Sequence, residues 1–218
     1  MRPAHEPRPV YVLDGRLYVN LTSRCPLRCR FCFKFQDRPD FYGHPLLLRE
    51  EDEPDVRAVE REIQAAPPHQ ELVFCGLGEP LERFPAVELL ARRYKQSDGG
   101  PVRVNTCGQY LAHGDEASLV RLARWVDCLA ISLNAPDAAT YDALCRPSRP
   151  GAFDRLLAFV RVARDAFSTV LLTAVSYPGV DLKACRALAH QLGLPLGVRP
   201  YEAAEDGRTA VRPPATQT

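Results

Sequence analysis

The stretch Thr22-Ser-Arg-Cys-Pro-Leu-Arg-Cys-Arg-Phe-Cys-Phe-Lys34 is the most informative part of this chain. Its three cysteines, Cys25, Cys29 and Cys32, have the spacing C-x3-C-x2-C. Three thiolates on one tight loop can hold three corners of an iron–sulfur cube and leave the fourth iron open, whereas standard four-cysteine sites close every iron. Because an open iron can bind a ligand, the loop predicts an enzyme rather than a simple electron carrier.

The bulk composition is that of an ordinary globular protein. The chain has 218 residues, of which 46% are hydrophobic and 25% charged, with a formal net charge of +1. This predicts one domain with one sizeable core and no electrostatic footprint for nucleic acid or membrane. No apolar run approaches the length of a membrane span, and the N-terminus lacks a signal-peptide core. We therefore expect a cytoplasmic protein whose eight cysteines are thiols and metal ligands.

Strand-like and helix-like segments alternate along the chain, which is typical of an α/β fold with parallel strands. Asp14-Gly15 predicts the turn of an opening hairpin between 10–13 and 16–21. Six strands with five β-to-α crossovers are fewer than the eight that close a barrel. We therefore predict a partial (β/α)6 TIM-type barrel, open on one side. The strands after the hairpin are expected at 71–75, 102–106, 128–133, 170–175 and 196–199.

The expected domain organisation has three parts. Residues 1–15 form an N-terminal extension with the hairpin, and residues 16–202 form the core. Residues 203–218 are polar, rich in Pro and Ala and without periodicity, which predicts a disordered tail.

Residues that could bind a ligand or take part in a reaction follow almost every predicted strand. The cysteine loop follows the first parallel strand, and Gly76-Leu-Gly-Glu-Pro80 follows the second. Because ligands bind at the carboxyl ends of parallel strands, these residues are expected to converge on one rim. The later strand ends contribute Asn105, Ser132, Asn134, Ser176, Tyr177, Arg199 and Tyr201.

The cysteine spacing, the aromatic residue Phe31 before the last cysteine, and the Gly-Glu-Pro motif resemble the radical S-adenosylmethionine (SAM) superfamily. Over roughly residues 16–202, the chain is also similar to one branch, the TatD-family-associated radical SAM proteins. One position departs from that branch, because Cys107 replaces the second Asn of Asn-Thr-Asn-Gly. The similar stretches are Leu17–Thr22, Phe74–Pro80, Ile131–Asp137, Leu144–Pro147 and Val198–Tyr201.

The resemblance implies a [4Fe–4S] cluster on Cys25, Cys29 and Cys32, with SAM bound at the open iron. Reductive cleavage of SAM would give a 5′-deoxyadenosyl radical that abstracts hydrogen from a substrate, which we leave unidentified. The missing strands suit a large substrate such as a macromolecule, and the branch suggests a functional link to a TatD-family nuclease.

The same resemblance suggests roles in SAM binding. Gly76 and Gly78 allow close backbone approach to the ligand, and Pro80 holds Glu79 extended so that it faces the SAM ammonium group. We expect Ser132 and Asn134, two apart at a strand end, to share a face and bind the ribose hydroxyls. The remaining cofactor contacts are predicted for Asn105, Phe31 and Arg199.

Four cations, Arg24, Arg28, Arg30 and Lys34, interleave the cysteines. They suggest a docking site for an acidic electron donor of the flavodoxin or ferredoxin type. The alternative is a solvated loop without a specific partner.

Other interpretations remain open. One is a 7-carboxy-7-deazaguanine synthase-like enzyme acting on a small molecule, and another is a glycyl-radical activase. A third, non-enzymatic reading is an iron–sulfur or zinc protein that binds a partner. Cys128 and Cys185 are expected to be core thiols, and packing is preferred over chemistry for Cys75 and Cys107. Cys145 either faces substrate or is a buried thiol, and His113 is either a proton donor or a surface histidine.

Overall fold

The chain folds around one seven-stranded sheet in the order β1-β2-β5-β6-β7-β8-β9. The structure, a computed structural model, describes residues 7–35, 40–41, 44–97, 99–203 and 209–211. β1 (Val10–Leu13) pairs antiparallel with β2 (Arg16–Val19), and all the other pairs in this sheet are parallel. The prediction of an open α/β sheet with six parallel strands is therefore confirmed. The remaining strands of this sheet are β5 (Leu72–Phe74), β6 (Val102–Thr106), β7 (Cys128–Ser132), β8 (Thr169–Val175) and β9 (Leu196–Arg199).

The helices follow the strands as the apolar periodicity predicts, and each crossover returns the chain to a parallel neighbour. Four of them begin at an aspartate whose carboxylate accepts a backbone N–H three residues on, which is a favoured way to start a helix. These caps are Asp55, Asp115, Asp137 and Asp181. The α-helices are α1 (Val56–Gln64), α2 (Phe84–Gln96), α3 (Glu116–Leu122), α4 (Ala138–Cys145), α5 (Ala152–Ala166) and α6 (Leu182–Gln191).

Short elements occupy the connections. Four 3-10 helices lie between the main elements, at η1 (Phe33–Phe35), η2 (Glu50–Asp52), η3 (Pro80–Arg83) and η4 (Tyr110–Ala112). Two small two-stranded sheets pair β3 (Asp40–Phe41) with β4 (His44–Pro45) and β10 (Tyr201–Ala203) with β11 (Thr209–Val211).

The opening hairpin is confirmed, and it belongs to the main sheet. Asp14 and Gly15 both have positive φ (49° and 71°), as a tight two-residue turn between antiparallel strands requires. β1 is therefore an edge strand of the core sheet. The domain boundaries at 15/16 and 202/203 stay predictions.

The predicted disordered tail is wrong at two places. Ala203 ends β10, and Thr209–Val211 forms β11, which pairs antiparallel with β10. The β-branched Thr209 and Val211 favour a strand although the surrounding composition is polar. The other residues of that prediction, 204–208 and 212–218, lie outside the described residues.

The two faces of the sheet differ. One face packs against the helices and forms the main core, to which strand residues such as Phe74, Val104 and Ile131 contribute. Because side chains alternate along a strand, the residues between them lie on the other face, here called the inner face. Register places Tyr18, Val73 and Arg103 side by side there, followed by Asn105 beside Ala130 and Ser132 beside Thr173.

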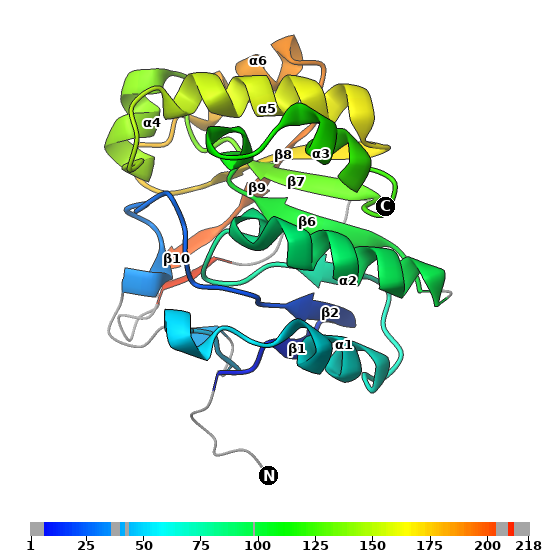
Figure 1. Cartoon of the computed structure of the whole chain (residues 1–218). Helices are drawn as coiled ribbons and strands as arrows, with labels where there is room; N and C mark the ends of the chain where they lie inside the picture. Colours follow the sequence, from blue (N-terminus) through cyan, green and yellow to red (C-terminus); the bar gives the residue numbers. More distant parts are fainter. Residues whose placement is uncertain (1–6, 36–39, 42–43, 98, 204–208, 212–218) are drawn as a thin grey trace.

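The carboxyl ends of the parallel strands and the cysteine loop lie on the same side of the molecule, at the left of Figure 1. In the same view α1 and α2 lie in front of the sheet, and α5 lies above β7 and β8. None of the helices in the described ranges has the length and apolarity that crossing a bilayer requires.

Candidate radical SAM site

The cysteine loop is held in place by a segment that follows it by more than half of the chain. The backbone N–H of Arg28 donates to the carbonyl of Cys145 (2.9 Å), and that of Arg30 donates to the carbonyl of Leu144 (2.9 Å). Ser148 N donates back to Pro26 O (2.9 Å), and Leu27 and Pro147 form a β-bridge. The end of α4 and the residues after it therefore act as a short strand against the loop.

Arg146 makes this pairing of residues 144–148 with the cysteine loop, here called the clamp, geometrically possible. It ends α4 in the left-handed conformation (φ 47°, ψ 63°), which is uncommon for a residue with a side chain. The reversal turns the chain so that the carbonyls of Leu144, Cys145 and Arg146 all face the loop.

All three predicted ligands are free, half-buried thiols. The pKa of Cys29 lies well above its ordinary value because its thiol hydrogen-bonds with Cys145 and because it is buried. Burial raises the pKa of Cys32 to about 11. In type and number the donors fit three corners of a [4Fe–4S] cluster. The described residues contain no three His, Cys, Asp or Glu side chains arranged to hold a metal ion, so ligation by these cysteines stays a prediction.

Glu79 joins the ends of β5 and β6. Its backbone is extended (φ −96°, ψ 113°), as the following Pro80 predicts, and its side chain is 3% exposed. The carboxylate accepts hydrogen bonds from Thr106 Oγ1 (2.7 Å), Cys107 N (2.5 Å) and Leu81 N (3.1 Å). Burial raises the pKa of Glu79, and these hydrogen bonds oppose that rise. Within the described residues, Glu79 is therefore a structural link as well as a candidate ligand for the SAM ammonium group.

The two glycines of the Gly-Leu-Gly-Glu-Pro motif serve close packing within the chain. A Cβ atom at Gly78 would lie 2.3 Å from the carbonyl oxygen of Thr22, and one at Gly76 would lie 1.8 Å from Asn20 Oδ1. These distances leave no room for a side chain. The backbone at both glycines is closely approached, as predicted. The group that approaches it is the segment leading into the cysteine loop.

Ser132 and Arg199 are brought together directly. Arg199 Nη2 donates to Ser132 Oγ (2.8 Å) and to Thr173 Oγ1 (2.7 Å), so one guanidinium joins the ends of β7, β8 and β9. Burial lowers the pKa of Arg199, and no ion pair balances its charge within the described residues. A half-buried cation whose side-chain partners are neutral hydroxyls is a natural partner for an anionic group of a ligand.

The strand geometry from which Asn134 is expected to share a face with Ser132 ends before Asn134. β7 ends at Ser132, and Asn134 lies beyond it in the left-handed conformation (φ 55°), so strand alternation no longer applies. Its Oδ1 accepts a hydrogen bond from Val175 N (3.1 Å), which ties the end of β7 to that of β8. Asn134 is therefore occupied in holding the rim together.

The remaining predicted residues lie around the same rim. Phe31 is buried, and its ring lies 5.7 Å from that of Tyr177, which in turn contacts Tyr201 at 4.8 Å. These contacts connect the cysteine loop to the end of β8. Asn105 is half-buried at the end of β6 on the inner face.

The inner face carries most of the unsatisfied polar groups. Six buried side-chain nitrogen or oxygen atoms of the described residues lack a hydrogen-bond partner. Five belong to residues on or leading to the inner face, and buried polar groups are normally paired. The five are Tyr18 Oη, Asn20 Oδ1, Arg103 Nε, Asn105 Oδ1 and Arg199 Nε.

Of the other five cysteines, Cys75 and Cys185 pack against hydrophobic core residues, and Cys107 and Cys145 contact the predicted ligands. Cys185 is fully buried in α6, and Cys128 is half-buried at the start of β7. Cys107 is 8% exposed, and burial together with a hydrogen bond to Cys25 places its pKa well above the ordinary value. Cys145 is fully buried against Cys29, so the buried-thiol reading of this residue is the correct one. His113 is exposed.

Sequence reasoning missed Arg103 and Thr173. Arg103 is 7% exposed on the inner face and pairs with Glu71 (2.8 Å). A charged residue inside the apolar run Val-Arg-Val was the available signal, since buried arginines need a partner. Thr173 sits in the β-branched run of β8 and has no comparable signal.

Comparison with known proteins identifies the family of this chain. The model of the radical SAM superfamily matches residues 19–192. A probable dual-specificity RNA methyltransferase RlmN of Synechococcus sp. (strain CC9311) is 30% identical over 154 residues, which is 66% of this chain and 42% of the relative. The corresponding protein of Parasynechococcus marenigrum (strain WH8102) is 33% identical over 153 residues, with the same coverage. The chain thus spans less than half the length of these relatives.

Solved structures share the fold at low sequence identity. The crystal structure of Streptococcus suis SuiB has a TM-score of 0.64 and 16% identity, over 91% of this chain and 42% of that one. Native anSMEcpe with bound AdoMet has a TM-score of 0.59 and 17% identity, over 84% and 50%. The family match covers most of the chain, including all three loop cysteines and the Gly-Glu-Pro motif. The chain belongs to the radical SAM superfamily, whose enzymes use a [4Fe–4S] cluster and S-adenosylmethionine.

Proposed function

We propose that this chain is a radical SAM enzyme that cleaves SAM reductively and abstracts a hydrogen atom from a substrate. The observation that carries the proposal is the convergence of the cysteine loop, Glu79, Ser132 and Arg199 on the carboxyl ends of consecutive parallel strands. The cluster and SAM, when bound, would supply the 5′-deoxyadenosyl radical. The chain itself would supply binding, orientation and exclusion of water.

In this proposal Cys25, Cys29 and Cys32 hold the cluster, and the rim from β5 to β9 holds SAM. Arg199 balances the carboxylate of the methionyl group, because its charge has no carboxylate partner within the described residues. The unsatisfied Asn105 Oδ1 supports a further hydrogen bond to a ligand donor on the inner face. Gly76, Gly78, Glu79, Pro80 and Phe31 shape the loops that surround this position.

The class of substrate is a finer proposal. The RlmN relatives are named as RNA methyltransferases, which supports an RNA substrate for this chain. The similarity of the strand-end motifs to the TatD-associated branch supports a functional link to a TatD-family nuclease, and both point towards nucleic acid. We further propose a cytoplasmic location and a flavodoxin or ferredoxin-type electron donor, since the enzymes of this family need a reductant.

The test is mass-spectrometric detection of 5′-deoxyadenosine. The protein is reconstituted anaerobically with iron and sulfide and then given SAM and dithionite, with and without total cellular RNA. We expect 5′-deoxyadenosine from the wild type and none from Cys29→Ala. A loaded cluster that binds SAM but yields none under either condition would contradict the proposal and favour a partner-binding iron–sulfur protein.

A further inference from the structure

A cavity of about 320 Å³ lies against the outer side of the cysteine loop. Its walls come from the cysteine loop, η3, the η4 region, the loop after α4, and α5. The side chains that matter for its chemistry are those of Arg24, Cys25, Glu82, His113, Arg149 and Arg155.

The cavity carries excess positive charge. Arg24 is balanced, because its guanidinium makes a two-point contact with Glu53 (2.8 and 3.2 Å). Arg149 donates only to a backbone carbonyl, that of Ala112 (3.1 Å). Arg155 donates to the carbonyls of Pro150 (2.7 Å) and Arg149 (3.3 Å), and its Nε is buried without a partner. Neither Arg149 nor Arg155 forms an ion pair with any described residue, and Glu82 is the one carboxylate in the lining.

Both guanidinium groups are held in place before any ligand arrives. The carbonyls that orient them belong to the loop after β6 and to the residues just before α5. Fixed cations without a counter-ion favour an anionic partner, because the cost of ordering the arginines is already met within the fold.

The position of the cavity separates it from the proposed substrate side. No residue of a sheet strand contributes to its lining, whereas the unsatisfied groups of the inner face come from the strands and their ends. Cys25 thus lines the cavity, whereas Ser132 and Arg199 do not.

The cavity also adjoins the clamp on the cysteine loop. Arg149 directly follows Ser148, whose N–H is hydrogen-bonded to Pro26 of the loop. A partner that binds Arg149 therefore touches the segment that fixes the backbone next to Cys25.

We propose that this cavity is the docking site of an acidic one-electron donor protein, whose carboxylates pair with Arg149 and Arg155. The inference rests on the proposed function, because it assumes a cluster on Cys25, Cys29 and Cys32. One electron passes from the donor to the cluster: the donor is oxidised by one electron, the cluster is reduced by one, and no bond or proton moves. Because electron transfer slows steeply with distance, a docking site beside a ligand cysteine places the donor where transfer is fast.

This location differs from the patch that the sequence suggested. Of the four loop cations, Arg24 is paired with Glu53, and Lys34 donates to the carbonyl of Ser23. Arg30 donates to Ala143 O (3.0 Å), and Arg28 stacks over the ring of Phe35 at 5.0 Å. Arg28 and Arg30 also form no ion pair with a described residue, but the cations that line the cavity without a counter-ion are Arg149 and Arg155, more than a hundred positions away in sequence.

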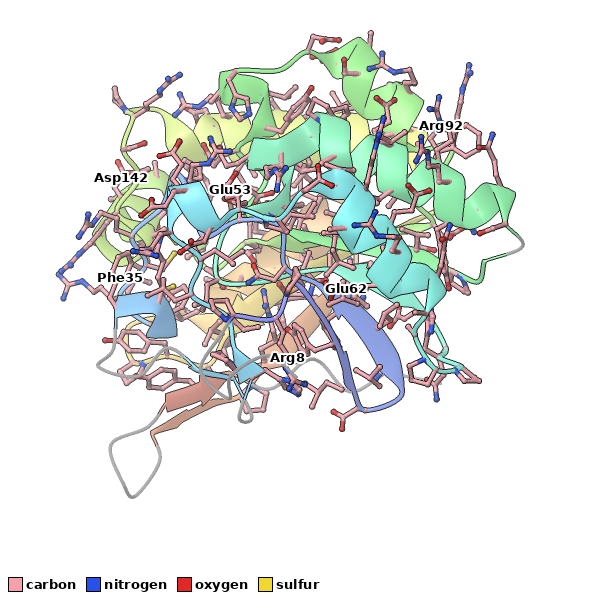
Figure 2. The ribbon with its side chains drawn as sticks, turned by 60° about the horizontal axis from the view of Figure 1, so that its bottom comes forward. Arg8, Phe35, Glu53, Glu62, Arg92 and Asp142 are labelled. Carbon is pink, nitrogen blue, oxygen red and sulfur yellow. The ribbon has the colours of Figure 1, made fainter. Side chains whose placement is uncertain are left out.

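The experiment measures the reduction of the reconstituted cluster by reduced flavodoxin. The visible absorbance of the cluster is followed in stopped flow, at low ionic strength and without SAM. We expect Arg149→Gln/Arg155→Gln to lower the second-order rate constant about tenfold, and added salt to remove most of that difference. Reduction by the methyl viologen radical, a small cation, should not be slowed. Arg92→Gln is the matched control, because Arg92 is exposed on α2 and lies across the molecule from Phe35 and the cysteine loop in Figure 2.

Equal flavodoxin rates for the wild type and the double variant would overturn the proposal. Saturable binding of pyrophosphate that depends on both arginines, with unchanged flavodoxin rates, would also overturn it and assign the cavity to a phosphate-bearing ligand. If Arg155→Gln impairs folding, Arg149→Gln against Arg149→Lys repeats the comparison at an exposed residue. If the wild type holds no cluster, the proposed function fails, and calorimetric binding of oxidised flavodoxin still tests the docking site.

Discussion

The backbone N–H of Cys107 donates a hydrogen bond to Glu79 Oε2 over 2.5 Å, in a position sealed from solvent. This contact joins the loops that follow two neighbouring strands, β5 and β6. With the Thr106 hydroxyl on the other carboxylate oxygen, it fixes the height of the Gly-Glu-Pro motif above the sheet.

Replacing Glu79 by alanine should therefore cost stability. The N–H of Cys107 and the hydroxyl of Thr106 would stay buried without an acceptor, which costs about 1–3 kcal/mol per unsatisfied group. We expect Glu79→Ala to lower the free energy of unfolding by at least that amount in urea titrations and to weaken SAM binding in equilibrium dialysis. Glu82→Ala, in the 3-10 helix that Glu79 caps, is the control. Unchanged stability would show that the contact does not hold the two loops together.

Gly78→Ala should be among the most damaging small substitutions. The added methyl group would lie 2.3 Å from the carbonyl oxygen of Thr22 and 2.6 Å from that of Arg24, and backbone cannot move aside as a flexible side chain can. We expect a loss of about 1–3 kcal/mol. Gly100→Ala, where the nearest atom is 3.5 Å away, should change the unfolding midpoint little. Similar midpoints for the two variants would contradict the packing argument.

Each loop cysteine should be required for the cluster. We expect Cys25→Ala, Cys29→Ala and Cys32→Ala to lose the visible absorbance and most of the bound iron after anaerobic reconstitution. Cys185→Ala should keep both, because its thiol is buried in α6 away from the loop. Full iron content in any of the three loop variants would remove that residue from the ligand set.

Arg199→Met should weaken SAM binding about tenfold or more, since a hydrogen bond to a charged group contributes about 1.5–3 kcal/mol. Arg199→Lys keeps the charge and has N–H donors, but its ammonium group lacks the planar, rigid fork of the guanidinium that contacts Ser132 and Thr173, so we expect an intermediate loss. Arg186→Met, exposed on α6, is the control. If calorimetry gives Arg199→Met the same SAM affinity as the wild type, Arg199 does not contact the SAM carboxylate and its charge serves another anion.

The stability that the Asp115 cap of α3 contributes should depend measurably on pH. The N–H and hydroxyl of Ser118 hold the pKa of Asp115 below its ordinary value of 3.8. The stabilisation is therefore fully present above pH 3.8 and is lost as the pH falls through the lowered pKa. Asp115→Ala should have a lower melting temperature than the wild type at pH 7, and this difference in melting temperature should shrink towards pH 3. A difference that is unchanged at pH 3, or equal to that of the exposed Asp142→Ala, would contradict this assignment.

The strands and helices of this fold could be predicted because their apolar patterns are local. β1, β6 and β9 have the predicted bounds, and the other strands of the sheet differ by one or two residues at their ends. The chemistry-bearing residues could also be placed at one rim, because parallel strands end on one side of a sheet.

The contacts inside the rim could not be predicted, because each joins residues far apart in the chain. Arg199 reaches Ser132 across β8, and Asn134 leaves the strand geometry to meet Val175 N. Cys145 looks like an ordinary helical cysteine, and only the left-handed Arg146 turns its carbonyl towards the loop. Periodicity carries no information about any of these pairings.

The clamp between Leu27 and Pro147 has a consequence for biosynthesis. The three cysteines emerge from the ribosome early, but the carbonyls that fix their loop are made only after more than half of the chain. Until α4 and Arg146 have been synthesised and folded, the thiols are presented on a segment without its backbone partners. Iron loaded before that moment would meet a flexible peptide, whereas iron loaded afterwards meets an ordered loop. We therefore expect cluster insertion to follow the synthesis of α4 rather than to precede it.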